Sequence, residues 1–294
     1  MTEREINDAL KESGHIKEGE SIRFVSLDDT IKFNCKRCGR CCSGRSDILL
    51  NPYDVYQIAK CLNISTTEVI KKYCIVSIGA NSNIPIVLLK EDERGLCPFL
   101  NYSVEDLSFK CSINDYKPGV CIMHPIGAIR QVNKPEESEN IVQYIEVPSC
   151  NVHDTSTEVK IKDFIKPYLD KGKYHNVGAL QLKEVVKYID TKRIGVLFED
   201  EELKDIKLIQ LYVDLVITSA YSYDTDRDFL EQIDEVKERI KKACFVIIAF
   251  CSMLGLDIAT SNLSENDKQT EIEITKCLAH FGNELDALKS FRSK

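Results

Sequence analysis

The chain has no long hydrophobic segment, no basic excess and few histidines. Its longest apolar run, Ala243 to Leu256, falls short of the roughly 20 residues that cross a bilayer, which predicts a buried helix in place of a membrane span. A formal net charge of -8 and a pI near 5.3 argue against a general nucleic-acid binder. We therefore expect neither a membrane nor a nucleic acid among its partners.

Two further absences bear on location and cofactor. The residues from Met1 to Glu20 are polar and charged and carry no secretory signal, so we expect a cytoplasmic protein. In that compartment cysteines serve as ligands more often than as disulfides, although disulfide pairing is the alternative. No Gly-x-Gly-x-x-Gly motif follows a predicted strand and opens a helix, so the sequence itself offers no support for an adenosyl cofactor.

Cysteine is what the chain has in quantity, with 13 in 294 residues. Residues 35–42 read Cys-Lys-Arg-Cys-Gly-Arg-Cys-Cys, and Gly39 relaxes the backbone beside the thiols. Cys35, Cys38 and Cys41 form a Cys-x2-Cys-x2-Cys run, similar to the first three ligands of a bacterial-type iron–sulfur cluster. The side chains of adjacent Cys41 and Cys42 diverge, so one of them faces a second centre or serves no metal.

Single cysteines further along extend this run to a candidate ligand set. Its members are Cys35, Cys38, Cys41, Cys42, Cys97, Cys111, Cys121 and Cys150. These thiols suffice for two four-coordinate sites, or for one cluster with spare or redox-active cysteines. Cys42 and Cys150 fit a first centre least well. His124 could add a ring nitrogen or tune a cluster by hydrogen bonding, but a loop histidine with no metal role is equally open, and His153 is a weaker candidate.

Positive charge is concentrated around the first cysteines. The segment from Ile31 to Ser46 contains no carboxylate and the following cations: Lys32, Lys36, Arg37, Arg40 and Arg45. Cations near thiols lower their pKa and offset the charge of a thiolate centre. The rival interpretation is a solvated basic loop that binds an anionic ligand or nucleic acid. Because the arginines interleave the cysteines, we favour neutralisation of a metal centre.

The other cysteines and histidines fit structural roles. Cys244 and Cys251 lie on an apolar stripe of helical spacing, where a buried cysteine behaves as a small hydrophobe. Cys61, Cys74 and Cys277 lie outside any ligand spacing. His15, His175 and His280 resemble ordinary surface or packing residues, and Asp54 suits the first turn of a helix.

The period of the hydrophobic pattern changes near residue 155, which predicts an α+β chain. We expect an N-terminal extension over 1–29, a small cysteine-rich metal-binding domain of short helices and strands over 30–155, and a mainly α-helical bundle over 156–294. The expected helices are 53–60, 66–73, 158–190, 202–219, 229–254 and 274–291, and the expected strands are 85–89, 109–113 and a hairpin of 126–132 with 141–147. Cysteines should therefore fall on loops and strand ends.

The order of the motifs resembles a known family. These motifs are Cys-x-x-Cys-Gly-x-Cys-Cys, Pro-x-Asp-x-x-x-Ile-Ala, Cys-Pro-Phe-Leu, Cys-x-Ile and Lys-Pro-x-x-Cys before a proline, and together they resemble the YkgJ-type cysteine-cluster domain over about 30–150. Lys117 stands where that family usually has arginine, and His124 where an aromatic residue commonly precedes the proline. The resemblance implies a zinc- or iron-chelating module. It also implies kinship with flagellin lysine-N-methylases, which are thought to carry an iron–sulfur cluster.

Three functions follow from these observations. The first is an iron–sulfur protein, of the 4Fe-4S type, whose cluster does redox or activating work; by resemblance alone this extends to N-methylation of a protein lysine with S-adenosylmethionine. The second is a structural zinc module whose helical half binds a partner. The third is a metal carrier. The compact triplet with scattered single cysteines favours iron–sulfur over zinc. No catalytic residue is identifiable, so the enzyme hypothesis rests on the resemblance.

Overall fold

The computed structural model describes residues 2–12, 16, 19–80, 82–131, 141–147, 154–199, 206–253, 256–261 and 263–276. By contacts between residues the chain forms two compact units. Unit 1 comprises Met1–Ile48 and Leu89–His175, and unit 2 comprises Leu49–Leu88 and Asn176–Lys294. Short strands and helices in the cysteine-rich region and helices in the C-terminal region confirm the α+β expectation. Residues 49–88 group with the C-terminal segment, although cysteine-rich sequence flanks them on both sides.

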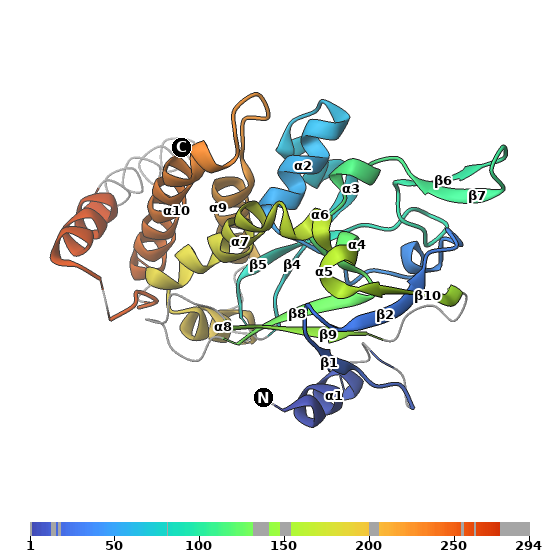
Figure 1. Cartoon of the computed structure of the whole chain (residues 1–294). Helices are drawn as coiled ribbons and strands as arrows, with labels where there is room; N and C mark the ends of the chain where they lie inside the picture. Colours follow the sequence, from blue (N-terminus) through green and yellow to red (C-terminus); the bar gives the residue numbers. More distant parts are fainter. Residues whose placement is uncertain are drawn as a thin grey trace. The chain divides into compact units, whose positions relative to one another are not determined.

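Unit 1 consists of short strands and short helices (Figure 1). Its elements are α1 (Glu3–Glu12), β1 (Arg23–Val25), β2 (Thr30–Asn34), the 3-10 turn η1 (Arg40–Cys42), β6 (Leu100–Ser103), β7 (Ser108–Cys111), η2 (Asn114–Tyr116), α4 (Gly119–Met123), β8 (Ile126–Gln131), β9 (Ile141–Glu146), β10 (Asp154–Lys160), α5 (Ile161–Phe164) and α6 (Lys166–Leu169). They pair as a three-stranded sheet in the order β1-β9-β8 and as two-stranded ribbons, β10-β2 and β6-β7.

The expected hairpin is confirmed in the antiparallel pair of β8 and β9. Ile126 lies opposite Glu146, and Gln131 lies opposite Ile141. The polar stretch that joins the two strands is outside the described residues. A strand was also expected at 109–113, and the structure has it as β7, where Cys111 lies opposite Leu100 of β6. The sequence pattern did not reveal β6, in which only Leu100 is buried.

The helix expected over 158–190 is wrong at its start and is divided along its length. Residues 154–160 form β10, which pairs antiparallel with β2 and places Val159 opposite Ile31. Pro167 lies at the start of α6 and cannot donate the backbone hydrogen bond that a continuous helix needs there. The remainder forms α7 (Gly172–Gln181) and the 3-10 segment η3 (Leu182–Lys187). Strand pairing with a distant segment overrode the local helical pattern.

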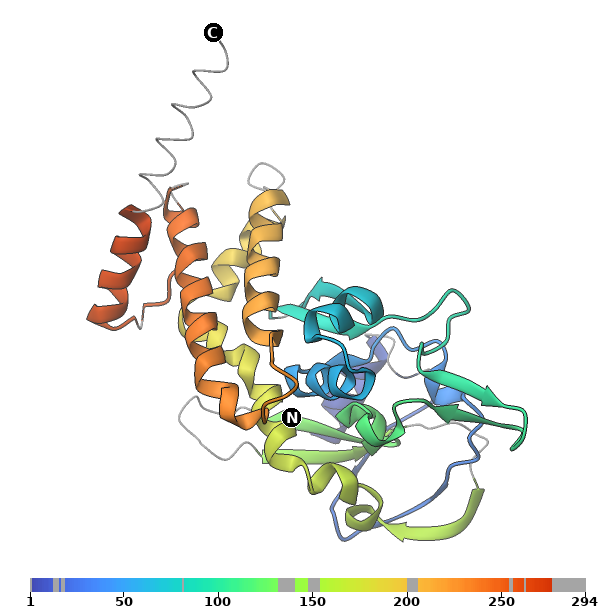
Figure 2. The same ribbon diagram turned by 90° about the horizontal axis from the view of Figure 1, so that it is seen from above.

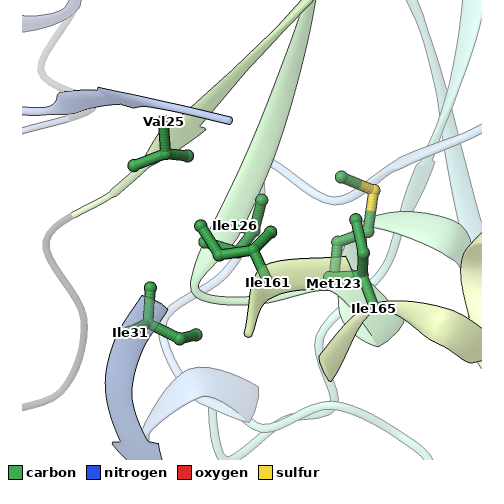
Figure 3. Close-up of a cluster of buried hydrophobic side chains, with 6 residues drawn as sticks. All are labelled: Val25, Ile31, Met123, Ile126, Ile161 and Ile165. Atoms are coloured by element: carbon green, nitrogen blue, oxygen red, sulfur yellow. The ribbon is translucent and has the colours of Figure 1, made fainter. Parts of the chain in front are cut away.

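A buried aliphatic cluster joins these elements of unit 1 (Figure 3). Its members come from β1, β2, α4, β8, α5 and the residue between α5 and α6: Val25, Ile31, Met123, Ile126, Ile161 and Ile165. Met123 belongs to the helix that also carries Cys121, and it lies next to His124 in sequence. Packing in this core therefore fixes the backbone of one segment of the cysteine-rich region.

Shortening Ile161 should destabilise the protein more than a matched surface change. Ile161 is 0% exposed, so Ile161→Ala removes buried methyl groups and leaves a cavity, which costs about 3 kcal/mol of unfolding free energy. Val104 is 76% exposed, and Val104→Ala should change that free energy by no more than about 0.5 kcal/mol. Urea unfolding followed by circular dichroism measures both. Equal effects would contradict the placement of Ile161 in the core.

Unit 2 is mainly helical. It contains β3 (Leu49–Leu50), α2 (Pro52–Leu62), α3 (Thr66–Tyr73), β4 (Cys74–Ile78), β5 (Pro85–Leu89), α8 (Thr191–Glu199), α9 (Ile206–Tyr221), η4 (Leu230–Gln232), α10 (Ile233–Met253) and a further helix over 265–276. The strands form a sheet in the order β3-β5-β4. Figures 1 and 2 show α9 and α10 side by side, and their residues are in contact. No helix in the described ranges has both the length and the apolarity to cross a membrane.

Local capping signals predicted the starts of two helices in unit 2. The Asn51 side chain accepts hydrogen bonds from the backbone N–H groups of Tyr53 (2.8 Å) and Asp54 (3.1 Å), while the Asp54 carboxylate accepts one from the Asn51 N–H at 3.0 Å. Asp54 is 2% exposed and its carboxylate caps the helix, which agrees with the expected place of Asp54 in a first helical turn. Ser65 and Glu68 form the second capping box, at the start of α3.

Candidate metal centre

The described members of the ligand set all lie in unit 1, on five short segments. Cys35 and Cys38 lie between β2 and η1, Cys41 and Cys42 are in η1, Cys97 precedes β6, Cys111 ends β7 and Cys121 is in α4. Loops and strand ends were expected, and Cys121 differs because it belongs to a short helix. Cys150 lies outside the described residues. None of the described cysteines is joined in a disulfide bond.

Backbone hydrogen bonds join η1 to the Cys97 segment and the Cys35–Cys38 loop to β7, so they connect four of these segments. The Cys97 N–H donates to the Cys42 carbonyl at 2.7 Å, and the Gly44 N–H donates to the Gly95 carbonyl at 3.0 Å. The Phe109 N–H of β7 donates to the Arg37 carbonyl at 3.0 Å. The loop that carries the first four cysteines is therefore fixed against both the Cys97 segment and the β6-β7 ribbon.

Gly39 is required at its position for two reasons. Its φ of 76° lies in the left-handed region, and a Cβ atom there would come within 3.1 Å of Phe109 Cγ and 3.3 Å of Leu100 Cδ2. The turn that follows is closed by the Cys42 N–H, which donates to the Gly39 carbonyl at 2.9 Å. The close approach of the cysteine loop to β7 thus depends on a residue without a side chain.

Replacing Gly39 should cost more stability than replacing a nearby glycine of similar backbone conformation. Gly44 has a φ of 63° but open space around its Cα, so Gly44→Ala should cost about 1 kcal/mol of unfolding free energy, from backbone strain alone. Gly39→Ala adds the contact with Phe109 and should cost about 3 kcal/mol. Denaturant unfolding of the two variants checks this order, which equal losses would refute.

Two cavities lie against the thiols. The larger cavity, of about 490 Å³, contacts Cys35, Cys38, Cys41, Cys42 and Cys111. The smaller cavity, of about 80 Å³, contacts Cys41, Cys42, Cys97, Cys111 and Cys121. Lys117 and His124 line both. The structure therefore brings together every described member of the ligand set, around two volumes that share Cys41, Cys42 and Cys111.

The sulfur atoms surround these cavities without converging on a single point. Within the described part of the chain, no three His, Cys, Asp or Glu side chains are arranged to hold one metal ion as drawn. Closing a coordination shell requires rotation of cysteine side chains between staggered rotamers. The chemistry of the donors nevertheless fits zinc or iron, since both take cysteine thiolates, and more thiols are present than the four that one tetrahedral ion uses.

The electrostatic environment favours at least one thiolate. The Sγ atoms of Cys41 and Cys42 are 3.9 Å apart, and the hydrogen bond between them lowers the pKa of Cys41 to about 6, with further help from the charges of Arg45 and Lys117. The same hydrogen bond raises the pKa of Cys42, as do the nearby Cys97 and Cys121. Burial raises the pKa of Cys97 and of Cys111. A bound cation would reverse these last shifts by favouring the thiolates.

Among the cations expected to serve the site, only some contact it. Arg45 lines the smaller cavity, and Lys36 and Arg37 line the larger one. Lys117 was not identified from the sequence as part of the site, although it contacts both cavities. Lys32 instead forms an exposed ion pair with Glu158 at 3.4 Å. The charge-rich segment therefore indicated where the site lies. The sequence alone could not distinguish the cations that line a cavity from those exposed to solvent.

His124 follows α4 and lines both cavities. Its Nε2 atom is buried and has no hydrogen-bond partner among the described residues. Burial is the main cause that lowers the pKa of His124 to about 4, and the Arg45 charge adds to it. The imidazole is therefore neutral near pH 7, the form in which a ring nitrogen binds a metal. Its edge contacts the Phe33 ring, with 6.5 Å between ring centroids.

The cysteines that the sequence excluded do not line either cavity. Cys244 and Cys251 are 0% exposed on α10, and burial raises the pKa of Cys251 to about 11. Burial also raises the pKa of Cys74 to about 12. His175 is 2% exposed and stacks on Tyr168, which agrees with a packing role. Cys277, His15, His153 and His280 lie outside the described residues.

Clustered thiols on loops pinned by a small α+β framework define a cysteine-based metal-binding domain. Comparison with known families agrees, because residues 34–144 match the CxxCxxCC family model, described as a "Putative zinc- or iron-chelating domain". This confirms the resemblance to the cysteine-cluster family over that segment and supports metal binding by its cysteines. No curated protein matches the chain. No solved structure matches it either.

Proposed function

We propose that this chain is an iron–sulfur protein whose cluster is held at the larger cavity. One observation carries the proposal: the thiols of five segments gather around adjoining cavities, in a number that exceeds the needs of a single tetrahedral ion. Iron–sulfur clusters are held by four cysteine thiolates, and the Cys-x2-Cys-x2-Cys run supplies three of them from one loop.

The residues that would hold the cluster are Cys35, Cys38, Cys41 and Cys111. The first two contact the larger cavity alone, and the Cys111 thiol reaches it from the end of β7. When bound, the cluster would supply one-electron redox chemistry or activation of a ligand. Lys36, Arg37 and Lys117 line the same cavity and would offset the negative charge of a tetrathiolate centre.

The finer activity that we propose is modification of a protein lysine, carried out in the cytoplasm. The family resemblance to the flagellin lysine-N-methylases supports this activity. The resemblance also implies S-adenosylmethionine as the methyl donor and a protein as the partner. Iron-loaded protein incubated with labelled S-adenosylmethionine and flagellin should yield methyl-lysine by mass spectrometry. Loss of that product in metal-free protein would tie the activity to the cluster, while absence of product from loaded protein would remove methylation and leave the cluster proposal intact.

Metal analysis after anaerobic purification tests the cluster itself. We expect about four irons and four sulfides per chain, with the visible absorption of a cluster and an electron paramagnetic resonance signal that appears on reduction. Zinc without iron or sulfide would overturn the proposal and leave a structural zinc module. Iron that dissociates readily to a chelator, with no sulfide, would instead indicate a metal carrier.

A further inference from the structure

The smaller cavity has thiols of its own that the proposed cluster does not use. Cys97 and Cys121 contact the smaller cavity and not the larger one, whereas Cys35 and Cys38 show the reverse. A volume of about 80 Å³ suits one ion with its ligands better than a polynuclear cluster. Cys97 and Cys121 therefore mark the smaller cavity and Cys35 and Cys38 the larger one, while Cys41, Cys42 and Cys111 line both.

Cys42 belongs with Cys97 and Cys121. Its carbonyl accepts the hydrogen bond from the Cys97 N–H, so the two residues are adjacent across the paired segments. Its thiol is close enough to Cys97 and Cys121 for their charges to act on it. Cys41 and Cys42 line both cavities and their Sγ atoms are 3.9 Å apart, so use of Cys41 by the cluster leaves Cys42 available to the smaller cavity.

His124 offers the fourth donor. Its Nε2 atom is a buried polar atom with no hydrogen-bond partner in the described part of the chain, which is a costly condition unless something occupies the position in front of it. The side chain lines the smaller cavity together with Cys42, Cys97 and Cys121. A metal ion would satisfy the imidazole nitrogen and the three thiolates at once.

We propose that Cys42, Cys97, Cys121 and His124 form a second metal centre, separate from the cluster, that holds one zinc ion. Three thiolates with one imidazole are an established donor set for tetrahedral structural zinc. The inference rests on the proposed function in one respect, since the cluster takes Cys41 and Cys111 from the cysteines that both cavities share. Zinc in this position ties η1 to the Cys97 segment and to α4.

Metal content of full-length variants expressed with iron and zinc both available tests the second centre. Wild-type protein should contain about one zinc beside its iron, and zinc X-ray absorption should show three sulfurs at about 2.3 Å and one nitrogen at about 2.0 Å. His124→Phe keeps an aromatic ring in contact with Phe33 and should lower zinc at least tenfold while iron is retained. His124→Cys should keep the zinc and convert the spectrum to four sulfurs.

Each other outcome decides against one of the two proposals. A zinc spectrum with sulfur ligands only in wild-type protein, or full zinc in His124→Phe, would overturn the role of His124. Iron at about four per chain with no zinc would overturn the second centre and leave the cluster proposal standing. Zinc bound by three sulfurs and one nitrogen, without iron, would overturn the cluster proposal and leave the second centre standing. The zinc X-ray absorption spectrum of the wild-type protein needs no variant. It therefore still tests the second centre if His124→Phe fails to fold.

Discussion

Cys38→Ser should lose nearly all of the iron that the wild-type protein binds. Cys38 is the middle residue of the triplet and contacts the larger cavity alone. The described thiol that lines this cavity beyond the proposed cluster ligands is Cys42, which the second centre uses. A serine hydroxyl is a poor ligand for a metal that prefers soft thiolates. We expect iron to fall from about four per chain to less than about one, with loss of the visible absorption.

Cys244→Ser is the matched control for that experiment. Cys244 is 0% exposed in α10 and lines neither cavity, so the substitution also replaces a thiol by a hydroxyl but should leave iron content unchanged. Elemental analysis of both variants, purified without oxygen, measures the contrast. Full iron in Cys38→Ser would remove the triplet from the site, and equal iron loss in both variants would show that the effect comes from unfolding.

Signals that act over a few residues were sufficient to predict the capped helices and the hairpin. Asn51 and Ser65 mark helix starts through hydrogen bonds to the next turn, and the alternation in β8 and β9 is visible without knowledge of the rest of the fold. The pairing of β10 with β2 could not be predicted, because it joins segments more than a hundred residues apart and competes with a helical pattern. Local preference is a weak prior when tertiary pairing is available.

The sequence likewise predicted the local features of the candidate site but not the features that depend on the fold. Spacing selected the candidate cysteines, and the structure gathers the described ones around two cavities, but their role as ligands stays a prediction. The division of thiols between two cavities depends on how the Cys97 segment and α4 approach that loop, which spacing does not encode. Lys117 was missed for the same reason. His124 was left open between ligand and loop residue, and its buried, unpaired Nε2 is what now favours the ligand role.

Removing the metals should unfold much of unit 1 while unit 2 keeps its helices. Cysteine-bound metal contributes on the order of 10 kcal/mol to folding, which equals the whole stability of a typical domain. The segments that carry the thiols are short loops, the 3-10 turn η1, the end of the two-stranded ribbon β6-β7 and the five-residue helix α4, so little regular secondary structure holds them. The core of α10, with Val236, Ile240 and Ile247 buried, contains no residue of the ligand set.

Hydrogen exchange on protein stripped of metal by chelation under reducing conditions measures this difference residue by residue. The amides of Cys97 and Phe109, which donate to the Cys42 and Arg37 carbonyls, should exchange much faster than in loaded protein. Amides in the middle of α10 should keep their protection and serve as the internal control. Metal added back should restore slow exchange at Cys97 and Phe109. Unchanged protection at these two amides would mean that the backbone bonds of the cysteine loop, and not the metals, hold the site together.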